Sequence, residues 1–449
     1  MVNLFEHFDS ETKALYDSLS LAGEQAPTIV LEDDGFLPEG MITPYQFFAS
    51  YRAPKNGRPL YFNAVPVPRF WEIEGNNEEA WVKDMSQKRA MIRYRPGEKR
   101  RHVSHVEWLN QQGKLQYVDH YTQHGVLFAQ TVYDLNRNMI FRRYFDQDGK
   151  DVIYYNFLAQ SVVLNWKGEQ YHFESHIAFL TFFLEALEID LSHFVVNSLG
   201  TPFSVLYYLN HTGQDVLYWQ EYCKGNVPGN MELIFNNDTG QRDFQIVVTH
   251  KEEYEAIAEA VSEDAREVIH DGGYLYQYEK TSTYQLQILT MTNTDQIHHI
   301  ASIIESCPFA TFHIGAVTEM SSVLTQLERY KNVRLYQAIE LSTVEKLYQK
   351  CDIYLDINEG GEIIDAVRKA FNYDMLILGY AAIAHNRTYT APQNLFSKED
   401  EAAALKQALR DVHLKKRYFK VRQNYQKAHA NEITVKQFKT IHQLAYGQK

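Results

Sequence analysis

The chain has 449 residues, and at about 150 residues per domain this length predicts two or three domains. Lys and Arg number 44 against 57 Asp and Glu, and the formal charge of −13 argues against a nucleic-acid-binding surface. No apolar run approaches the roughly 20 residues that span a bilayer, the first residues lack a signal-peptide pattern, and the three cysteines fit neither a disulfide framework nor a zinc site. These features predict a cytoplasmic protein with no bound metal.

The first 58 residues have the pattern of a βα opening. A helix, a buried strand with an acidic end and a short aromatic helix are predicted in turn, at residues 6–21, 28–34 and 45–51. From residue 59 to residue 174, short alternating runs are separated by turn signals such as His124-Gly125 and Asp148-Gly149. This second pattern predicts an antiparallel β-meander, with no helix before Ser175.

After the meander, α/β patterning resumes at His176. The predicted elements are a helix, three buried strands and two helices, at residues 177–187, 192–198, 204–209, 244–249, 251–260 and 263–270. The meander (residues 59–174) is therefore predicted to be inserted into a first Rossmann-like domain made of residues 1–58 and 175–275.

Residues 276–449 predict a second Rossmann-like domain. Strand-like runs at residues 284–290, 309–315, 333–336, 352–357 and 375–379 alternate with helical runs at residues 294–306, 318–330, 343–350 and 362–373. Strands that alternate with helices of this length indicate βαβ units and a parallel sheet. Three C-terminal helices follow, at residues 401–412, 415–427 and 433–445.

A candidate ligand-binding turn follows the fourth strand of this second domain. The strand at residues 352–357 leads into Asn358-Glu359-Gly360-Gly361-Glu362 and then into a helix. A glycine pair before a helix start exposes backbone N–H groups and can hold an anion. Glu362 and Asp365 would satisfy the same positive helix end, so a plain capped helix start is the alternative.

Four segments of the second domain resemble the nucleotide-sugar half of retaining GT-B glycosyltransferases. These are Val333-Arg-Leu-Tyr, Val344-Glu-Lys-Leu-Tyr, Cys351-Asp-Ile-Tyr-Leu-Asp-Ile-Asn-Glu-Gly-Gly and Met375-Leu-Ile-Leu-Gly. The family has two glutamates eight residues apart, the first contacting the donor sugar and the second the ribose. The first matches Glu359, but the second falls on Val367, which cannot hydrogen-bond a ribose.

A second family feature is missing as well. The family grips the donor diphosphate with a basic pair after the first strand of this half, and residues 289–300 contain no Lys or Arg. His298 and His299 are poor substitutes for that pair. Together with Val367, this absence predicts that the chain uses no sugar nucleotide and has no cofactor or catalytic residues.

With the inserted meander, the whole chain resembles the paired subunits of the bacterial O-linked N-acetylglucosaminyltransferase that modifies serine-rich-repeat adhesins. One subunit is catalytic, and the other, the GtfB family of the accessory Sec system, is a degenerate homologue. The lost donor groups align this chain with the second. The resemblance implies a GT-B-like pair of domains and a pseudoenzyme that stabilises and activates the catalytic subunit. It also implies a 2:2 heterotetramer, a Ser/Thr-rich acceptor polypeptide and peripheral contact with the cytoplasmic face of the membrane.

Six residues are candidates for contact with the acceptor, in a cleft between the two Rossmann-like halves that no diphosphate occupies: Glu359, Gly360, Gly361, Tyr218, Trp219 and His250. A structural histidine is the alternative for His250, and core packing is the alternative for the aromatic residues. The basic segment at residues 98–102 is either a membrane contact or a solvated turn.

The meander is predicted to dock the catalytic subunit, because one face of an inserted sheet need not be covered by the parent domain. Its aromatic residues are Tyr117, Tyr121, Phe128, Tyr133, Phe141, Tyr144, Tyr154, Tyr155 and Trp166. Two other functions stay open at this point: an active retaining GT-B glycosyltransferase, and a carbohydrate- or protein-binding scaffold without a transferase partner.

Overall fold

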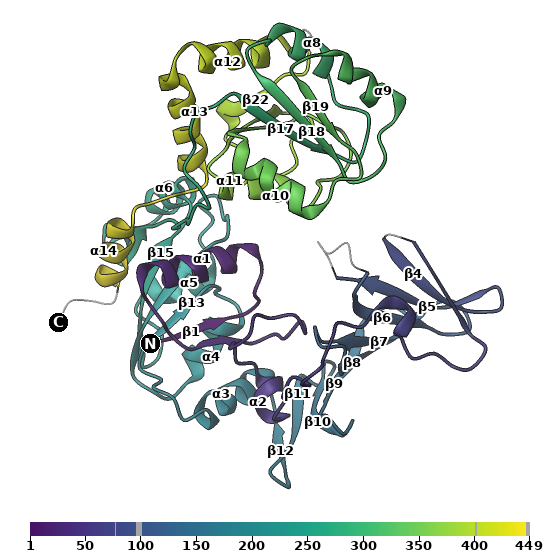
Figure 1. The fold of residues 1–449 in the computed structure, drawn as a ribbon. Helices are drawn as coiled ribbons and strands as arrows, with labels where there is room; N and C mark the ends of the chain where they lie inside the picture. The colour runs from purple at the N-terminus through teal and green to yellow at the C-terminus, as the bar shows by residue number, and fades with distance from the viewer. Residues whose placement is uncertain (77, 96–100, 400–401, 446–449) are drawn as a thin grey trace. The chain divides into compact units, whose positions relative to one another are not determined.

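A computed structural model describes residues 1–76, 78–95, 101–399 and 402–445 (Figure 1). The chain forms two compact units. Unit 1 comprises Met1–Gly272 and the C-terminal residues from Lys439, and unit 2 comprises Gly273–Phe438. In the basic segment predicted at residues 98–102, residues 98–100 lie outside the described residues.

Unit 1 contains a parallel sheet with the strand order β16-β15-β14-β13-β1-β2. Its strands are β1 (Val2–Phe5), β2 (Thr28–Val30), β13 (Phe194–Val196), β14 (Gly213–Trp219), β15 (Arg242–Val248) and β16 (Ile269–Asp271). Its helices are α1 (Ser10–Ala22), α2 (Pro44–Phe48), α3 (His176–Ala186), α4 (Thr201–Tyr208), α5 (Gly229–Phe235), α6 (Lys251–Ala260) and α7 (Glu263–Arg266).

Local chemistry fixes the ends of these helices. The side chain of Asp9 accepts from the backbone N–H of Thr12 at the start of α1, and Gly23 ends that helix with a φ of 93°. Ser175 caps α3 in the same way, by accepting from the backbone N–H of Ala178. The predicted helix start after Ser175 is therefore confirmed.

Three predictions in this unit are wrong. The helix predicted at residues 263–270 ends at Arg266, because Ile269–Asp271 forms β16 at the edge of the sheet. Strand β1 was not predicted, because a four-residue strand is too short to show a period, although all four residues are buried. Residues 204–209 were predicted to be a strand but lie in or next to α4, because the run of Val, Leu and Tyr resembles a buried strand. The stronger signals were Gly200 at the N-cap and Pro202 in the first turn.

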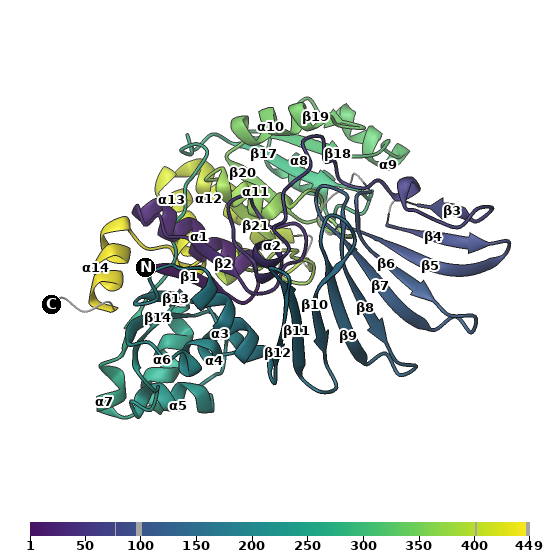
Figure 2. The same ribbon diagram turned by 90° about the horizontal axis from the view of Figure 1, so that it is seen from below.

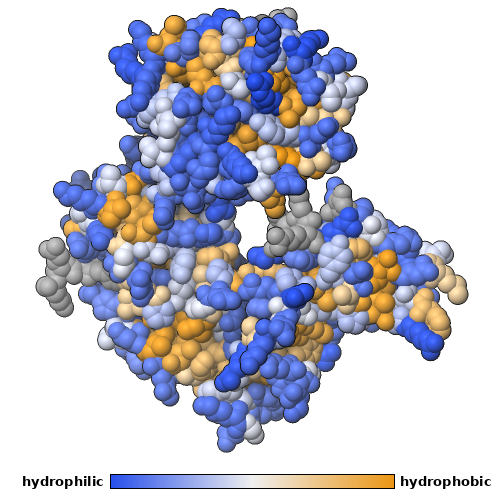
Figure 3. Space-filling model, in the orientation of Figure 1, coloured by the Kyte–Doolittle hydropathy of each residue, from blue (hydrophilic) through white to orange (hydrophobic). Residues whose placement is uncertain are grey.

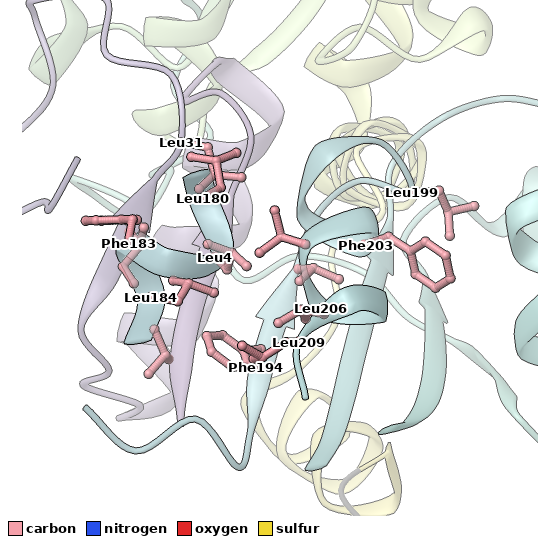
Figure 4. Packing of buried hydrophobic residues seen from close by; sticks show 14 of the residues in the cluster. Leu4, Leu31, Leu180, Phe183, Leu184, Phe194, Leu199, Phe203, Leu206 and Leu209 are labelled. Atoms are coloured by element: carbon pink, nitrogen blue, oxygen red, sulfur yellow. The ribbon is translucent and has the colours of Figure 1, made fainter. Parts of the chain in front are cut away.

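The core of unit 1 lies against its parallel sheet. Figure 4 shows leucines and phenylalanines of α3 and α4 gathered around Leu4 of β1 and Phe194 of β13: Leu180, Phe183, Leu184, Phe203 and Leu206. Each of these side chains is at most 2% exposed. The predicted helix at residues 177–187 and the predicted strand at residues 192–198 therefore contribute to this core, and so do β1 and α4, which the sequence pattern did not predict.

Between α2 and α3, the described residues form a ten-stranded antiparallel sheet whose strands follow one another in chain order (Figure 2). They are β3 (Glu72–Gly75), β4 (Glu79–Asp84), β5 (Gln87–Tyr94), β6 (Val103–Leu109), β7 (Leu115–Tyr121), β8 (Leu127–Tyr133), β9 (Met139–Phe145), β10 (Asp151–Asn156), β11 (Ser161–Trp166) and β12 (Glu169–Phe173). A short 3-10 helix, η1 (Phe62–Ala64), precedes them. The predicted antiparallel meander is confirmed.

The second half of the meander shares its core with the rest of unit 1. Phe48 of α2 lies 5.2 Å from Trp166 of β11, between ring centroids, and 5.5 Å from Phe179 of α3. Val162 and Leu164 of β11 belong to the same buried cluster as the residues of the parallel sheet. The strands from β8 to β12 are therefore packed against the Rossmann-like part through one continuous apolar core.

At the end formed by β3 to β6, the meander buries the face opposite to the one that packs against the Rossmann-like part. Ala80, Val82, Ala90, Ile92 and Val106 form an outer cluster, with Leu60 and Phe62 packed against it. Because cross-strand partners share a face, the pairing places this face on the side of Phe141 and Tyr154. Apolar residues also reach the surface over the β4–β5 end of the meander (Figure 3), where Met85 is 90% exposed.

Unit 2 contains a parallel sheet with the strand order β19-β18-β17-β20-β21-β22. Its strands are β17 (Gln287–Thr292), β18 (Thr311–Ala316), β19 (Val333–Tyr336), β20 (Ile353–Asp356), β21 (Leu376–Tyr380) and β22 (Leu395–Phe396). Its α-helices are α8 (Ile300–Ser306), α9 (Ser322–Thr325), α10 (Leu341–Lys350), α11 (Ala366–Asn372), α12 (Ala403–Leu414) and α13 (Lys416–His429). Its 3-10 helices are η2 (Gln326–Arg329) and η3 (Pro392–Asn394).

The C-terminal helix α14 (Val435–Ala445) differs from the prediction, which assigned all C-terminal helices to the second domain. From Lys439 onward the helix packs with unit 1. There the hydroxyl of Tyr218 lies 2.9 Å from Nδ1 of His442, and both side chains are buried. The sequence pattern predicts that this helix forms, but it does not show which unit the helix packs against.

Candidate functional site

The loops that follow β17 and β20 are joined to each other. In a sheet of this order, the chain changes direction between these two strands, and ligands bind outside their carboxyl ends. Here Ile297 and Asn358 form an antiparallel bridge across that point. The backbone N–H of Glu359 donates to the carbonyl of Gln296 (2.9 Å), and that of His298 donates to the carbonyl of Ile357 (3.2 Å). The crevice at the switch point is therefore closed by the chain's own backbone.

Glu359 lies on this closure with a partly exposed carboxylate. Its Oε1 lies 2.6 Å from Nε2 of His298 and 3.5 Å from Nζ of Lys398. The hydrogen bond and charge of His298, with a smaller effect of Lys398, hold the pKa of Glu359 below its ordinary value. Both contacts use one carboxylate oxygen, so Oε2 of an ionised Glu359 is available to accept further hydrogen bonds.

Gly360 is held from the opposite side by His385, which lies in the loop after β21. Nδ1 of His385 lies 2.5 Å from Oδ1 of Asp356, and its Nε2 lies 2.7 Å from the carbonyl oxygen of Gly360. Both partners can only accept, so both ring nitrogens must carry hydrogen, as in the imidazolium. The hydrogen bond to the buried Asp356 raises the pKa of His385 to about 9.

The glycine pair leaves its backbone donors exposed. Gly360 has a φ of 102°, and a Cβ there would lie 2.9 Å from Oδ1 of Asn293. A Cβ on Gly361 would meet open space. Among the described residues, no group accepts a hydrogen bond from the backbone N–H of Gly360 or Gly361. The turn therefore offers N–H donors beside the carboxylate of Glu359.

Val367 is fully buried. It lies in the first turn of α11 and packs in a core cluster with Val344, Leu347 and Tyr348. Its backbone N–H donates to Oε1 of Glu362, which takes the place of a ligand at this helix start (2.8 Å). A ribose could not reach this position, and Glu362 makes the contact with the helix start that an anionic ligand would otherwise make.

A cavity of about 320 Å³ opens beside the loop after β17. It is lined by Asn293, Thr294, Asp295, Ala316, Thr318, Glu319, Ser321 and Leu324. These described lining residues include two carboxylates and no Lys or Arg, so the cavity repels a diphosphate and suits neutral hydrogen-bonding groups.

The switch point of unit 1 is also occupied by the chain itself. Glu6 follows β1, and its Oε1 accepts from the hydroxyl of Thr201 (2.7 Å) and its Oε2 from that of Ser198 (2.8 Å). The side-chain oxygen of Asn197 accepts from the backbone N–H of Glu6 at 3.2 Å. A carboxylate thus fills the start of α4, where an anionic ligand would otherwise bind.

Of the candidates in unit 1, Tyr218 and Trp219 are corrected to core residues. They are 1% and 2% exposed, on the buried strand β14, and a buried ring offers no surface to an acceptor. His250 is the N-cap residue of α6 and is 7% exposed, with its ring stacked on Tyr222 at 4.6 Å between centroids. Glu359, Gly360 and Gly361 are the candidates that the structure leaves accessible.

Four family models match the chain, and each describes one of its segments. They are the GtfB N-terminal domain (residues 2–48), the GtfB middle domain (71–174), the GtfB third domain (176–260) and the GftB/GlyA-F C-terminal domain (288–426). A Streptococcus pneumoniae protein, the UDP-N-acetylglucosamine–peptide N-acetylglucosaminyltransferase stabilizing protein GtfB, is 37% identical over 452 residues and covers 100% of both chains. The chain belongs to the GtfB family.

Solved structures agree with this membership. A chain of a GtfA/B complex bound to UDP and GlcNAc matches this GtfB-family chain with a TM-score of 0.90 and 37% identity, over 98% of this chain and 99% of that one. The pneumococcal O-GlcNAc transferase GtfA matches with a TM-score of 0.51 and 14% identity, over 100% and 99% of the two chains, which shows a shared fold. The predicted fold, a GT-B-like pair of Rossmann-type domains with an inserted meander, is confirmed.

Sequence reasoning missed His385 and Lys398, which complete the site of this GtfB-family member. His385 is 29 residues from Asp356, and Lys398 is 39 residues from Glu359. One signal could have found His385: it follows β21, and the carboxyl ends of neighbouring parallel strands lie at one edge of a sheet. No spacing rule predicts which residue of such a loop turns inward.

Proposed function

We propose that the chain is the non-catalytic subunit of a protein O-N-acetylglucosaminyltransferase. It stabilises and activates a homologous catalytic subunit, which transfers N-acetylglucosamine from UDP-GlcNAc to Ser and Thr of serine-rich-repeat adhesins, and it binds that acceptor polypeptide. The full-length relative is named a stabilizing protein, and the solved relative is part of a GtfA/B complex.

The observation that carries the proposal is the closed switch point of unit 2. An active retaining transferase needs this crevice for its donor, and here backbone hydrogen bonds join the two loops across it. The buried Val367 and the cation-free cavity remove the ribose and diphosphate contacts independently. A family member that cannot hold the donor retains two roles, which are to stabilise the partner and to bind the acceptor.

Acceptor binding is tested at Gly361, where an added side chain meets open space. Gly361→Trp should weaken the binding of a Ser/Thr-rich peptide at least tenfold, because an indole covers the exposed donors of the turn. Gly361→Ala is the matched control and should bind as the unchanged chain does. Isothermal titration measures both, and equal affinity of all three proteins would place the acceptor elsewhere. Gly360→Trp is less suitable, because its φ of 102° would strain the backbone.

The partner is proposed to dock on the open face of the meander. Tyr117 of β7, Phe141 of β9, Tyr154 of β10 and Val163 of β11 lie on this face, half-buried and outside both the shared core and the outer cluster. The rings of Phe141 and Tyr154 are 5.1 Å apart between centroids. A homologous partner carries the same sheet, so pseudo-twofold pairing of two such faces would build a 1:1 heterodimer, and a 2:2 heterotetramer would join two of these dimers through a second surface.

Membrane contact is proposed for helix α13. Residues 412–430 contain six Lys and Arg and no acidic residue in a chain of charge −13. The exposed apolar residues of α13 follow a helical spacing: Tyr418, Val421 and Tyr425. Such a helix lies on an anionic bilayer surface. None of the helices in the described part of the chain is long and apolar enough to cross a membrane.

Charge reversal tests the membrane proposal. Lys415→Glu with Arg417→Glu should lower binding to phosphatidylglycerol vesicles at least 30-fold, since each cation contributes about 1 kcal/mol near such a surface. Lys331→Glu with Lys346→Glu makes the same change in net charge at exposed positions elsewhere in unit 2 and is the control. Vesicle sedimentation gives the comparison. Equal losses in both proteins, or no loss in the first, would rule out a specific role for α13.

A further inference from the structure

The turn at Glu359–Gly361 is held by a residue that belongs to neither the turn nor its strand. The His385 side chain is 11% exposed, and the Asp356 side chain is fully buried. Asp356 also accepts from the backbone N–H of His385 (2.8 Å), so the ring is fixed at three points: its own backbone and both nitrogens. This arrangement leaves the ring no lone pair with which to act as a base.

The hydrogen bond from His385 determines which side of Gly360 faces outward. With the carbonyl of Gly360 bonded to Nε2 of His385, the N–H groups of Gly360 and Gly361 remain without an acceptor among the described residues, and both residues are exposed. A peptide unit has its carbonyl and N–H on opposite sides, so a fixed carbonyl fixes the direction of the next donor.

We propose that His385 is the positioning residue of this turn, and that the N–H of Gly361, which it orients, and the exposed N–H of Gly360 bind main-chain carbonyl oxygens of the acceptor while Glu359 accepts from an acceptor N–H or hydroxyl. The inference rests on the proposed acceptor-binding function. It names the recognised chemistry as the peptide backbone, so that small side chains such as Ser, Thr, Gly and Ala are all tolerated.

Backbone recognition suits a repetitive acceptor, because every repeat offers the same carbonyl and N–H groups. The glycine pair has no Cβ to obstruct an approaching chain, and the cavity beside it is lined by neutral polar groups and carboxylates. Both contacts of Glu359 with described residues use Oε1, so its Oε2 can accept a hydrogen bond from the polypeptide. The turn therefore offers both an acceptor and donors to an extended polypeptide.

The test compares His385→Gln with the unchanged chain by titration of a Ser/Thr-rich peptide. A glutamine side chain is neutral and donates through one nitrogen, so it cannot bond Asp356 and Gly360 in the way that imidazolium does. We expect at least tenfold weaker binding at pH 7.5. Gly360→Ala should weaken binding similarly, because φ of 102° disfavours a side chain, whereas Gly361→Ala should not.

A pH profile separates positioning from a general loss of structure. Binding by the unchanged chain should weaken as the pH rises through about 9, where His385 loses its proton, and this step should be absent in His385→Gln. The charged groups around the ring are Asp356 and Glu362, and Glu359, His298 and Lys398 lie on the other side of the turn. Lys398→Met removes the ammonium group that contacts Glu359 and is the control for a change of charge elsewhere on the turn.

A persistent step in His385→Gln, or unchanged affinity of that variant at pH 7.5, would overturn the inference while leaving acceptor binding intact. If the unchanged chain itself fails to bind the peptide, the proposed acceptor-binding function fails, and the inference with it. If His385→Gln does not fold, the profile of the unchanged chain and that of Lys398→Met still decide: a step near pH 9 in both supports the inference, and no step overturns it.

Discussion

Replacing both Phe141 and Tyr154 with Asp is expected to weaken binding of the catalytic partner at least 100-fold. These rings form a pair on the open face of the meander, 5.1 Å apart between centroids and only half-buried in the isolated chain. Aromatic residues at the centre of an interface commonly contribute 2 kcal/mol or more each, and two introduced carboxylates would be desolvated without partners. Surface plasmon resonance with immobilised catalytic subunit measures the loss.

The control for this experiment removes apolar surface from the tips of the same sheet. Met85→Asp with Leu158→Asp changes residues that are 90% and 74% exposed in hairpin turns, and it adds the same charge. This control should bind the partner normally. If the control loses binding and the face variant does not, the partner docks on the hairpin tips and the proposed interface is wrong.

Phe48→Ala should lower the free energy of unfolding of the chain by about 3–5 kcal/mol. The Phe48 side chain lies where α2, α3 and the meander meet, with centroid distances of 5.2 Å to Trp166, 5.5 Å to Phe179 and 5.9 Å to Phe183. Truncation leaves a cavity among rings that cannot collapse onto an alanine. Domain stabilities of 5–15 kcal/mol make this a large fraction of the total.

Urea denaturation followed by tryptophan fluorescence measures this change. Phe70→Ala is the matched control, because the Phe70 side chain is 85% exposed and its loss should cost less than about 0.5 kcal/mol. A cost below 1 kcal/mol for Phe48→Ala would mean that the meander is held to the Rossmann-like part by other contacts. The shared core also means that deletion of residues 59–174 would remove part of the core of unit 1, so point substitutions test docking better than deletion.

Hydrophobic periodicity predicted most of the fold, because the spacing of apolar residues in a strand or helix shows which of its faces is buried. The strand β19 (Val333–Tyr336) and the helix α6 (Lys251–Ala260) have the predicted bounds. The failures occurred where a short segment has two consistent interpretations. Residues 204–209 combine the composition of a strand with the spacing of a helix, and their helical state is determined by Gly200, Pro202 and the packing of Phe203.

The candidate site could be predicted only where it is local in sequence. The glycine turn and the segment without Lys or Arg (residues 289–300) are each continuous in the sequence, so they can be recognised from the residues alone. Whether a side chain is buried depends on contacts that are distant in the sequence. Tyr218 and Trp219 are residue types that can bind an acceptor, yet they are buried in β14 of the parallel sheet. The partners of Glu359 and Gly360 come from the loops after β17, β21 and β22, and only the fold brings these together.

The central claim is tested most directly by a reconstituted transferase assay with UDP-GlcNAc and a Ser/Thr-rich acceptor. Three samples are compared: this chain alone, the catalytic subunit alone, and the two co-expressed. We expect no UDP release and no transfer by this chain alone. We expect more soluble catalytic subunit, and faster transfer per catalytic subunit, when this chain is present. Sugar transfer by this chain alone, after removal of any contaminating transferase, would contradict the account.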